Sequence, residues 1–509
     1  MVELPRAFVF GIDGATFDLI DPLVAEGHLP NLAKLLAVSA SAKTDCTWPA
    51  HTGPGWVSLV AAGHPGHHAI YQFFDVQEPR YRARIVGSSD CGCSTAWDWL
   101  VASGYSLGLV NVPMSHPPRH LPGYQITWPL MQTLHYAEPR SLLGELARAG
   151  SHFKSDLAAM YRGNIGYIHE ALANVDARVR SMKYLLRTHP VDVVMMVLTE
   201  ADRVCHHYWH FSDVDHPRYT HSTEDVYRNA IRHIYESIDW ALGEILSQIP
   251  DSCSVLVVSD HGFGPGHQSF SVHRWLSEVG LLAAQSTNGS SGGEREQASW
   301  FTERDVQVDW ERTQVYMPVP GSFSLNVNQR GRQRQGIVNL ADVEFILEDV
   351  TAALVDLRIP SNGRRVFSRI LRREEAFSGM NSYSSPDLLL IPADESLMVT
   401  PSLIDETWSA SYQTGLHRHE GMWIHRSPGV RAGRLDFNIQ LIDIFPTLLA
   451  ELGVSIPCNV PGKVISRMFR TAPVDQRSKV PVFSEVANKE QPDWGDDMLT
   501  KRLKDMGYL

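Results

Sequence analysis

Three short apolar runs that each lead to an aspartate constrain this chain most. The segments are AFVFGID, VDVVMMVLTEAD and SVLVVSD, which end at Asp13, Asp202 and Asp260. Their central aliphatic and aromatic residues are typical of strands buried on both faces of a parallel sheet. Polar side chains that follow such strands gather at the carboxyl edge of the sheet, where open α/β sheets bind ligands. The pattern therefore predicts an α/β fold with one site at this edge.

Histidines and a threonine accompany the three aspartates. Asp202 and His206 are four residues apart, so both would face one side of a helical turn. His261 follows Asp260 directly, and the GFGP after it predicts a sharp loop. Thr52 lies in the turn-rich PAHTGPGW, ahead of a helix-like WVSLVAAG whose N-terminus would direct N–H groups at an anion. Mixed histidine and carboxylate ligands suit zinc-like metals, and two such ions can clamp both oxygens of a displacement at phosphorus.

Each of these residues also has an ordinary structural explanation. An aspartate after a strand is more often a helix cap than a ligand, and an Asp-x-x-x-His pair is as often a solvated helix face. His417, in the segment TGLHRHEG, is one of 23 histidines in the chain. The five segments together, in this order, favour a two-metal phosphate site over separate structural roles.

The chain resembles the alkaline phosphatase superfamily, in its type I phosphodiesterase / nucleotide pyrophosphatase branch. It is most similar to a group described as predicted phosphohydrolases or phosphomutases. The likeness is carried by FGIDG, PAHTGPGW, TEADRVCHHYW, VVSDHGFG and TGLHRHEG, and it spans nearly the whole chain. It implies a metal-dependent phosphoric ester hydrolase acting on a small-molecule phosphate ester, with phosphodiester or nucleotide-like substrates favoured.

The resemblance also implies a role for each matching position. Thr52 resembles the nucleophile, which would form a phosphothreonine intermediate. The implied ligands of the metal that activates it are the Thr52 oxygen, Asp13, Asp260 and His261. The implied ligands of a second metal are Asp202, His206 and His417. Two divalent ions are expected, with zinc first and manganese or iron as alternatives, because all three accept this ligand set.

One position departs from the resemblance and bears on substrate binding. Nucleotide pyrophosphatases carry an asparagine that contacts a phosphate oxygen 21 positions after the nucleophile, and this chain has Phe73 there. Arg203 or Arg418 could grip that oxygen instead, because a guanidinium group matches phosphate geometry. Trp56 could form an aromatic wall of the pocket, with a core position as an equal alternative. These four residues are the substrate-binding candidates.

Other functions stay open beside phosphodiester hydrolysis. A phosphotransferase or phosphomutase would pass the phosphoryl group from Thr52 to an acceptor, and a phosphomonoesterase would use the same site. A non-catalytic scaffold is a third hypothesis, against which the complete set of ligands argues. A sulfatase is disfavoured, because the CTWPA that begins at Cys46 lacks the spacing and the arginine of a C/S-x-P-x-R motif.

The order of these patterns predicts the organisation of the chain. Residues 1–270 and 395–475 are expected to form a doubly wound, mostly parallel sheet sandwiched by helices, with a helical insertion at about 138–188. Residues 271–394 are expected to form a smaller inserted α+β cap, in which SFSLNVNQRG predicts a strand and VEFILEDVTAALVDLRI a helix. Residues 476–509 are expected to pack on the core as a C-terminal tail.

Composition restricts the partners and the location. The net charge of −12 argues against a nucleic-acid polymer as the partner. No apolar run reaches 18 residues and no signal-peptide pattern occurs, so neither a membrane span nor secretion is expected. Six cysteines in 509 residues are too sparse for a disulfide framework, which favours a cytoplasmic location. The sequence leaves homo-oligomer formation open.

Overall fold

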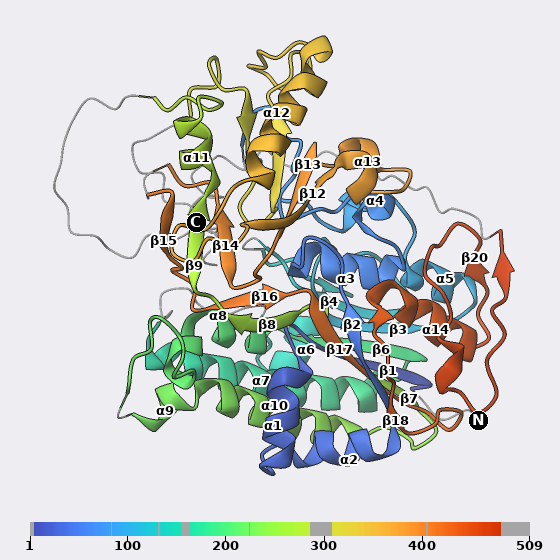
Figure 1. Cartoon of the computed structure of the whole chain (residues 1–509). Helices are drawn as coiled ribbons and strands as arrows, with labels where there is room; N and C mark the ends of the chain where they lie inside the picture. The colour runs from blue at the N-terminus through green and yellow to red at the C-terminus, as the bar shows by residue number, and fades with distance from the viewer. Residues whose placement is uncertain are drawn as a thin grey trace.

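A ten-stranded central sheet organises the computed structural model, which describes residues 5–82, 84–130, 133–154, 163–222, 224–285, 308–403 and 406–479 (Figure 1). Its strands are β1 (Ala7–Ile12), β2 (Ala40–Asp45), β3 (Leu107–Val112), β4 (Gly123–Thr127), β5 (Ala137–Glu138), β6 (Val193–Leu198), β7 (Ser254–Val258), β17 (Glu420–Arg426), β18 (Gly433–Arg434) and β19 (Ile439–Gln440). Their order is β18-β2-β17-β7-β1-β6-β3-β4-β5, and β19 also pairs with β2. Most of the pairs are parallel, which confirms the predicted sheet.

The three apolar runs form the middle of this sheet. β1 pairs in parallel with β6 on one side and with β7 on the other. Every residue of the three strands is buried. Ile12 lies opposite Leu198 in register, so the segments that follow the two strands leave the sheet at one edge. This register places Asp13 beside the start of the helix that carries Asp202.

Helices cover both faces of the sheet, and the residues of β1 alternate between them. Phe8 and Phe10 face one apolar cluster, whereas Val9 faces the other. The first cluster includes residues of α1 (Phe17–Ala25), α2 (Pro30–Val38), α6 (Leu142–Arg148), α7 (Ile165–Thr188), α8 (Glu200–Ser212) and α10 (Ala230–Leu246). The second includes residues of α3 (Thr52–Ala61), α5 (Ala96–Ala102) and α14 (Ile444–Glu451). The stretch predicted as a helical insertion thus supplies α7, which packs with α8 and α10 in one layer.

A second, smaller assembly of strands and helices lies over the edge of the sheet near α3 (Figure 1). A four-stranded sheet in the order β10-β11-β13-β12 contains β10 (Val315–Tyr316), β11 (Ser324–Val327), β13 (Leu388–Pro392) and β12 (Phe367–Arg372). A three-stranded sheet in the order β14-β9-β15 contains β14 (Leu397–Thr400), β9 (Gln268–Ser271) and β15 (Trp408–Ala410). These sheets share an apolar cluster of their own with α11 (Val272–Glu278) and α12 (Val343–Val355). The predicted strand and helix are present as β11 and α12.

The boundaries of the predicted units stay a prediction. Because β14 and β15 join the second assembly, its apolar cluster extends beyond residue 394. Of the predicted tail, Arg477–Ser478 forms β21, which pairs with β20 (Ile456–Pro457). Residues 480–509 lie outside the described residues. Within the described part of the chain, no helix has the length and apolar character needed to span a membrane.

Candidate active site and metal centre

Asp13, Asp260 and His261 leave the carboxyl ends of β1 and β7 and meet in a buried cluster. Asp13 is 1% exposed, and the other two are fully buried. His261 Nε2 lies 3.4 Å from Asp13 Oδ1 and 3.3 Å from Asp260 Oδ2. One potential ligand atom from each residue lies within 4.8 Å of the other two. We call this group cluster A; it offers two carboxylates and one imidazole.

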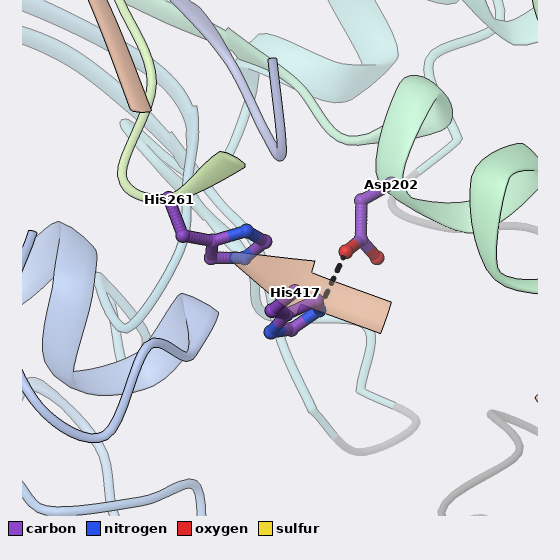
Figure 2. Close-up of side chains that lie close together, drawn as sticks. All are labelled: Asp202, His261 and His417. Atoms are coloured by element: carbon purple, nitrogen blue, oxygen red, sulfur yellow. Dashed lines mark hydrogen bonds and ion pairs between the residues drawn. The ribbon is translucent and has the colours of Figure 1, made fainter. Parts of the chain in front are cut away.

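Asp202, His206 and His417 form cluster B beside it. The first two lie on consecutive turns of α8, and His417 lies on β16 (Gly415–Arg418), which pairs with β8 (Gly262–Pro265). His417 Nε2 lies 3.0 Å from Asp202 Oδ1 and 3.0 Å from His206 Nε2. The rings of His417 and His261 stack with centroids 3.7 Å apart, so the two clusters adjoin. Figure 2 shows Asp202, His261 and His417 converging from three segments.

Backbone carbonyls orient all three imidazoles. The Nδ1 atoms of His206, His261 and His417 lie 2.9, 3.0 and 3.0 Å from the carbonyl oxygens of Gly415, Gly262 and Ala50. A carbonyl only accepts hydrogen bonds, so Nδ1–H is the donor in each pair. In the neutral imidazole the lone pair is then on Nε2, the atom that faces the carboxylates. This arrangement of donor and lone pair is typical of histidines that bind metals.

Thr52 is the first residue of α3 and faces cluster A. Its Oγ1 donates a hydrogen bond to Asp13 Oδ1 at 3.3 Å and lies 3.4 Å from His261 Nε2. The N-cap residue is His51, whose Nδ1 accepts the Gly53 N–H at 3.3 Å. The positive end of the helix dipole therefore lies beside the Thr52 hydroxyl, where it favours an anion.

The two clusters differ in their charge state. Burial and the neighbouring Asp202 raise the pKa of Asp13, and burial and Asp13 raise the pKa of Asp260 well above its usual value. Burial opposes the charged form of His261, but Asp260 and the bond to Asp13 outweigh it and raise the pKa of His261 to about 10. Within cluster A without a metal, His261 therefore holds a proton at neutral pH.

Cluster B has the opposite tendency. Burial alone would raise the pKa of Asp202, but the adjacent imidazoles, His206 first, outweigh burial and hold that pKa well below its usual value. Burial and the nearby His261 lower the pKa of His417 to about 3. Asp202 is thus ionised and His417 neutral at neutral pH, which are the forms that bind metals.

The residues fit divalent metal ions. Asp260 Oδ2 is buried and accepts no hydrogen bond from the described residues, although it faces His261. Two buried carboxylates side by side need a cation for compensation. In cluster B, two imidazole nitrogens and one carboxylate oxygen lie 3.0 to 3.3 Å from one another, and zinc takes ligands of these kinds.

The substrate-binding candidates divide into two groups. Phe73 and Arg203 line a cavity in front of Thr52. Trp56 is fully buried in the core, where its Nε1–H donates to Asp13 Oδ2 at 3.2 Å. The guanidinium of Arg418 donates to the carbonyl oxygens of Glu395 and of Pro265, the latter at 2.5 Å. Trp56 and Arg418 therefore lie outside the lining of this cavity, Trp56 in the core position that the sequence left as its alternative.

The cavity opens to solvent, and the centres of water-sized molecules can occupy about 80 Å³ within it. Several of its lining residues were not identified from the sequence: His51, Gln72, Tyr167, Phe323 and Glu395. The sequence could have indicated His51, since it directly precedes Thr52 in a turn-rich segment. It could not have indicated Phe323 and Glu395, because they come from segments far from every site motif.

Comparisons with known proteins agree with this geometry. The family model described as type I phosphodiesterase / nucleotide pyrophosphatase matches residues 7–425. A phosphonoacetate hydrolase from Sinorhizobium meliloti 1021, in complex with phosphonoformate, is 15% identical with a TM-score of 0.55, over 87% of this chain and 94% of that chain. Murine ectonucleotide pyrophosphatase / phosphodiesterase 5 is 11% identical with a TM-score of 0.52, over 90% of this chain and 97% of that chain. An inactive threonine-to-alanine form of the murine protein has been solved with AMP. No curated protein matches the chain.

Proposed function

We propose that this chain, which belongs to the type I phosphodiesterase / nucleotide pyrophosphatase family, cleaves a phosphate ester in two displacements through a phosphothreonine at Thr52. The family makes it a phosphoric ester hydrolase of the alkaline phosphatase superfamily. The observation that carries the proposal is the position of the Thr52 hydroxyl, at a helix N-terminus and within 3.4 Å of cluster A.

Two divalent ions are the proposed cofactors. Asp13, Asp260, His261 and the Thr52 oxygen would hold one, and Asp202, His206 and His417 the other. Zinc is the expected metal, with manganese and iron as alternatives. When bound, such ions would neutralise the phosphate and favour ionisation of the Thr52 hydroxyl.

In the first displacement, Thr52 Oγ1 bonds to phosphorus while the ester P–O bond breaks and the alcohol leaves. The hydrogen bond to Asp13 orients Oγ1, and the N-terminus of α3 favours the anionic phosphoryl group. Arg203 lines the cavity and is the proposed donor to the phosphate oxygen that an asparagine contacts in relatives. In the second displacement, water attacks phosphorus and the bond to Thr52 Oγ1 breaks. A diester would then release a phosphomonoester, and a monoester would release phosphate.

Transfer to an acceptor is a second candidate function. Much of the cavity wall is apolar, and an apolar wall around the phosphoryl group disfavours water as the second nucleophile. An acceptor alcohol would then take the phosphoryl group from Thr52, as in a phosphotransferase or a phosphomutase. Phosphomonoester hydrolysis is a third variant of the same chemistry.

The test uses protein reloaded with zinc or manganese and assayed on p-nitrophenyl phosphate and bis-p-nitrophenyl phosphate. Thr52→Ala should lower kcat by at least about a thousandfold, because the nucleophile is lost. Thr52→Ser keeps a hydroxyl and should retain measurable turnover. Metal analysis of both variants should show a metal content close to that of the wild type, because Asp13, Asp260 and His261 remain as ligands. A wild-type rate for Thr52→Ala would overturn the proposal, as would full activity without metal. If transfer dominates, added acceptor alcohols should be phosphorylated, and less of the phosphoryl group should pass to water.

A cytoplasmic location is part of the proposal. All six cysteines are free, which agrees with a reducing compartment. The substrate is a small molecule, since the acidic chain suits a nucleic-acid polymer poorly.

A further inference from the structure

The wall of the active-site cavity is mainly apolar. Aromatic and aliphatic side chains from the core and from the second assembly line it: Trp48, Phe73, Phe74, Pro320, Phe323, Pro392, Leu397, Met398, Val399 and Leu416. Residues of this kind bind an organic group by removing its apolar surface from water. These side chains come from both the core and the second assembly, so the apolar wall extends beyond the residues that would hold a phosphate.

The cavity offers little positive charge outside the two clusters. Apart from histidines and Asp202, the charged lining residues among those described are Arg203 and Glu395. Arg203 Nη1 lies 3.8 Å from Asp202 Oδ2, so part of its charge is already compensated. Glu395 is an acid, and it accepts the His419 N–H at 3.0 Å. A polyphosphate chain would bring several negative charges to a wall that cannot compensate them.

A strained loop brings part of this wall close to Thr52. Gly321 and Phe323 both have positive φ, of 70° and 47°. A Cβ on Gly321 would lie 3.4 Å from the ring of His51, which precedes the nucleophile. Gln72 Nε2–H donates to the Pro320 carbonyl at 3.2 Å and ties the loop to the core. Positive φ is unfavourable for an aromatic residue, and such strain is typical of ligand-binding loops.

We infer that the substrate carries one phosphoryl group esterified to a bulky, apolar, uncharged alcohol, and that Phe323 is a specificity-determining residue for that alcohol. This inference rests on the proposed function and narrows it. The apolar wall would bind the alcohol, Arg203 and the two clusters would bind the single phosphoryl group, and nucleoside polyphosphates would be poor substrates.

The test compares p-nitrophenyl phosphodiesters whose second arm is methyl, phenyl or octyl, with ATP as the polyphosphate. The reporting group is the same in all three diesters, so differences in kcat/KM come from the arm. The octyl and phenyl arms should exceed the methyl arm by about tenfold or more, and ATP should react more slowly than any of them. Equal rates for methyl and octyl arms, or a preference for ATP, would overturn the inference.

A binding measurement separates this inference from the proposed function. Calorimetry on the same metal-loaded protein would compare octylphosphonate, methylphosphonate and pyrophosphate. Octylphosphonate should bind about tenfold tighter than either of the others even if no ester turns over. Absence of turnover with this binding order would refute the hydrolase and keep the inference, whereas tightest binding of pyrophosphate would refute the inference.

Phe323→Asn isolates the proposed specificity residue. Asparagine tolerates positive φ, so the loop can keep its conformation while the ring is lost. The octyl-to-methyl ratio of kcat/KM should fall about tenfold, because the long arm loses the contact with the ring and the short arm has less of that contact to lose. Tyr383→Asn is the matched control, since Tyr383 is an aromatic residue that is 74% exposed and outside the cavity lining. An unchanged ratio in Phe323→Asn would contradict the role of Phe323.

Discussion

Asp13 connects the nucleophile to the core, because its two carboxylate oxygens have different partners. Oδ1 accepts the Thr52 hydroxyl, and Oδ2 accepts the Trp56 indole N–H at 3.2 Å. Trp56 is fully buried against Gly11, where a Cβ would lie 2.6 Å from the indole. The indole is therefore fixed in position, and its hydrogen bond fixes Oδ2 of the Asp13 carboxylate.

Trp56→Phe should reveal this positioning role. The variant keeps most of the ring volume and removes the donor, so unfolding should become easier by only about 1 kcal/mol. The looser Asp13 carboxylate should lower kcat by about ten- to hundredfold with little change in KM. Urea denaturation and steady-state kinetics measure the two effects, and metal analysis controls for ligand loss. A fall in stability without a fall in kcat would assign Trp56 to packing alone.

Metal binding to cluster A should displace a proton from His261, whereas Asp202 and His417 of cluster B have no proton to lose. The pKa of His261 is raised to about 10, so His261 holds a proton at pH 7 that a metal must displace, and the raised pKa of Asp260 acts in the same direction. Asp202 and His417 are already in their metal-binding forms. The affinity of cluster A should therefore rise with pH between about 6 and 9, and cluster A should lose its metal first on acidification.

Calorimetric titration with zinc in two buffers of different ionisation enthalpy counts these protons. The wild type should release at least about one proton per protein at pH 7. His417→Ala should keep this release, because it alters cluster B, and Asp260→Asn should reduce it. Equal release from the two variants would contradict the assignment.

At the scale of elements, a buried ion pair joins α7 to the first turn of α8. Arg178 Nη1 lies 2.5 Å from Glu200 Oε1, and the two side chains are 0% and 1% exposed. Glu200 begins α8 and is two residues before Asp202. The pair thus fixes the helix end that presents cluster B. Removing one charge from such a pair leaves the other buried and uncompensated.

Glu200→Gln should destabilise the fold by about 3–5 kcal/mol, whereas replacing both residues by methionine should recover much of that loss. Zinc affinity at cluster B should fall in both variants, since the helix end is less constrained. The Arg180–Asp176 pair on α7 is the control: its side chains are 55% and 43% exposed, so Asp176→Asn should cost less than about 1 kcal/mol. Urea denaturation measures all three variants, and a cost for Glu200→Gln equal to the control would refute the role of the pair.

At the scale of the whole molecule, the sequence predicted the sheet edge better than the cavity. Asp13, Asp202 and Asp260 follow strands whose apolar runs are unambiguous, and parallel pairing then brings them together. The family model confirms the resemblance to the family. Only that resemblance links His417, which lies in a distant segment, to the three aspartates. Strand identity and order therefore carry most of the information about clusters A and B.

The directions of long side chains and the origin of the cavity wall could not be predicted in this way. Arg418 neighbours His417 in sequence, yet alternation along β16 turns its guanidinium to backbone carbonyls. Trp56 lies one turn after Thr52, on the face of α3 that packs on the sheet. Phe323 reaches the cavity only because the second assembly folds over α3, a long-range contact that leaves no local pattern.

The proposed ions would also link parts of the molecule that are distant in sequence. Their ligands come from the end of β1, from α8, from the end of β7 and from β16. A ligand that binds only the folded state stabilises it by RT ln(1 + [L]/Kd), about 4 kcal/mol at a thousand times Kd. Chelation should therefore lower Tm, and added zinc should restore it in a concentration-dependent way.

Calorimetric unfolding with and without chelator measures this link. His417→Ala keeps cluster A, so zinc should raise its Tm by less than it raises that of the wild type. Tyr383→Asn should respond as the wild type does, because Tyr383 is exposed and lies outside the cavity lining. A Tm that chelation leaves unchanged in the wild type would mean that the clusters hold no ion under those conditions.

The size of the Tm shift also depends on the unfolded chain, since any zinc bound by its 23 histidines reduces the stabilisation. At lower pH the histidines of the unfolded chain are protonated and bind less zinc, whereas Asp202 and His417 of cluster B stay in their metal-binding forms. Repeating the titration at lower pH should therefore increase the share of the Tm shift that comes from cluster B.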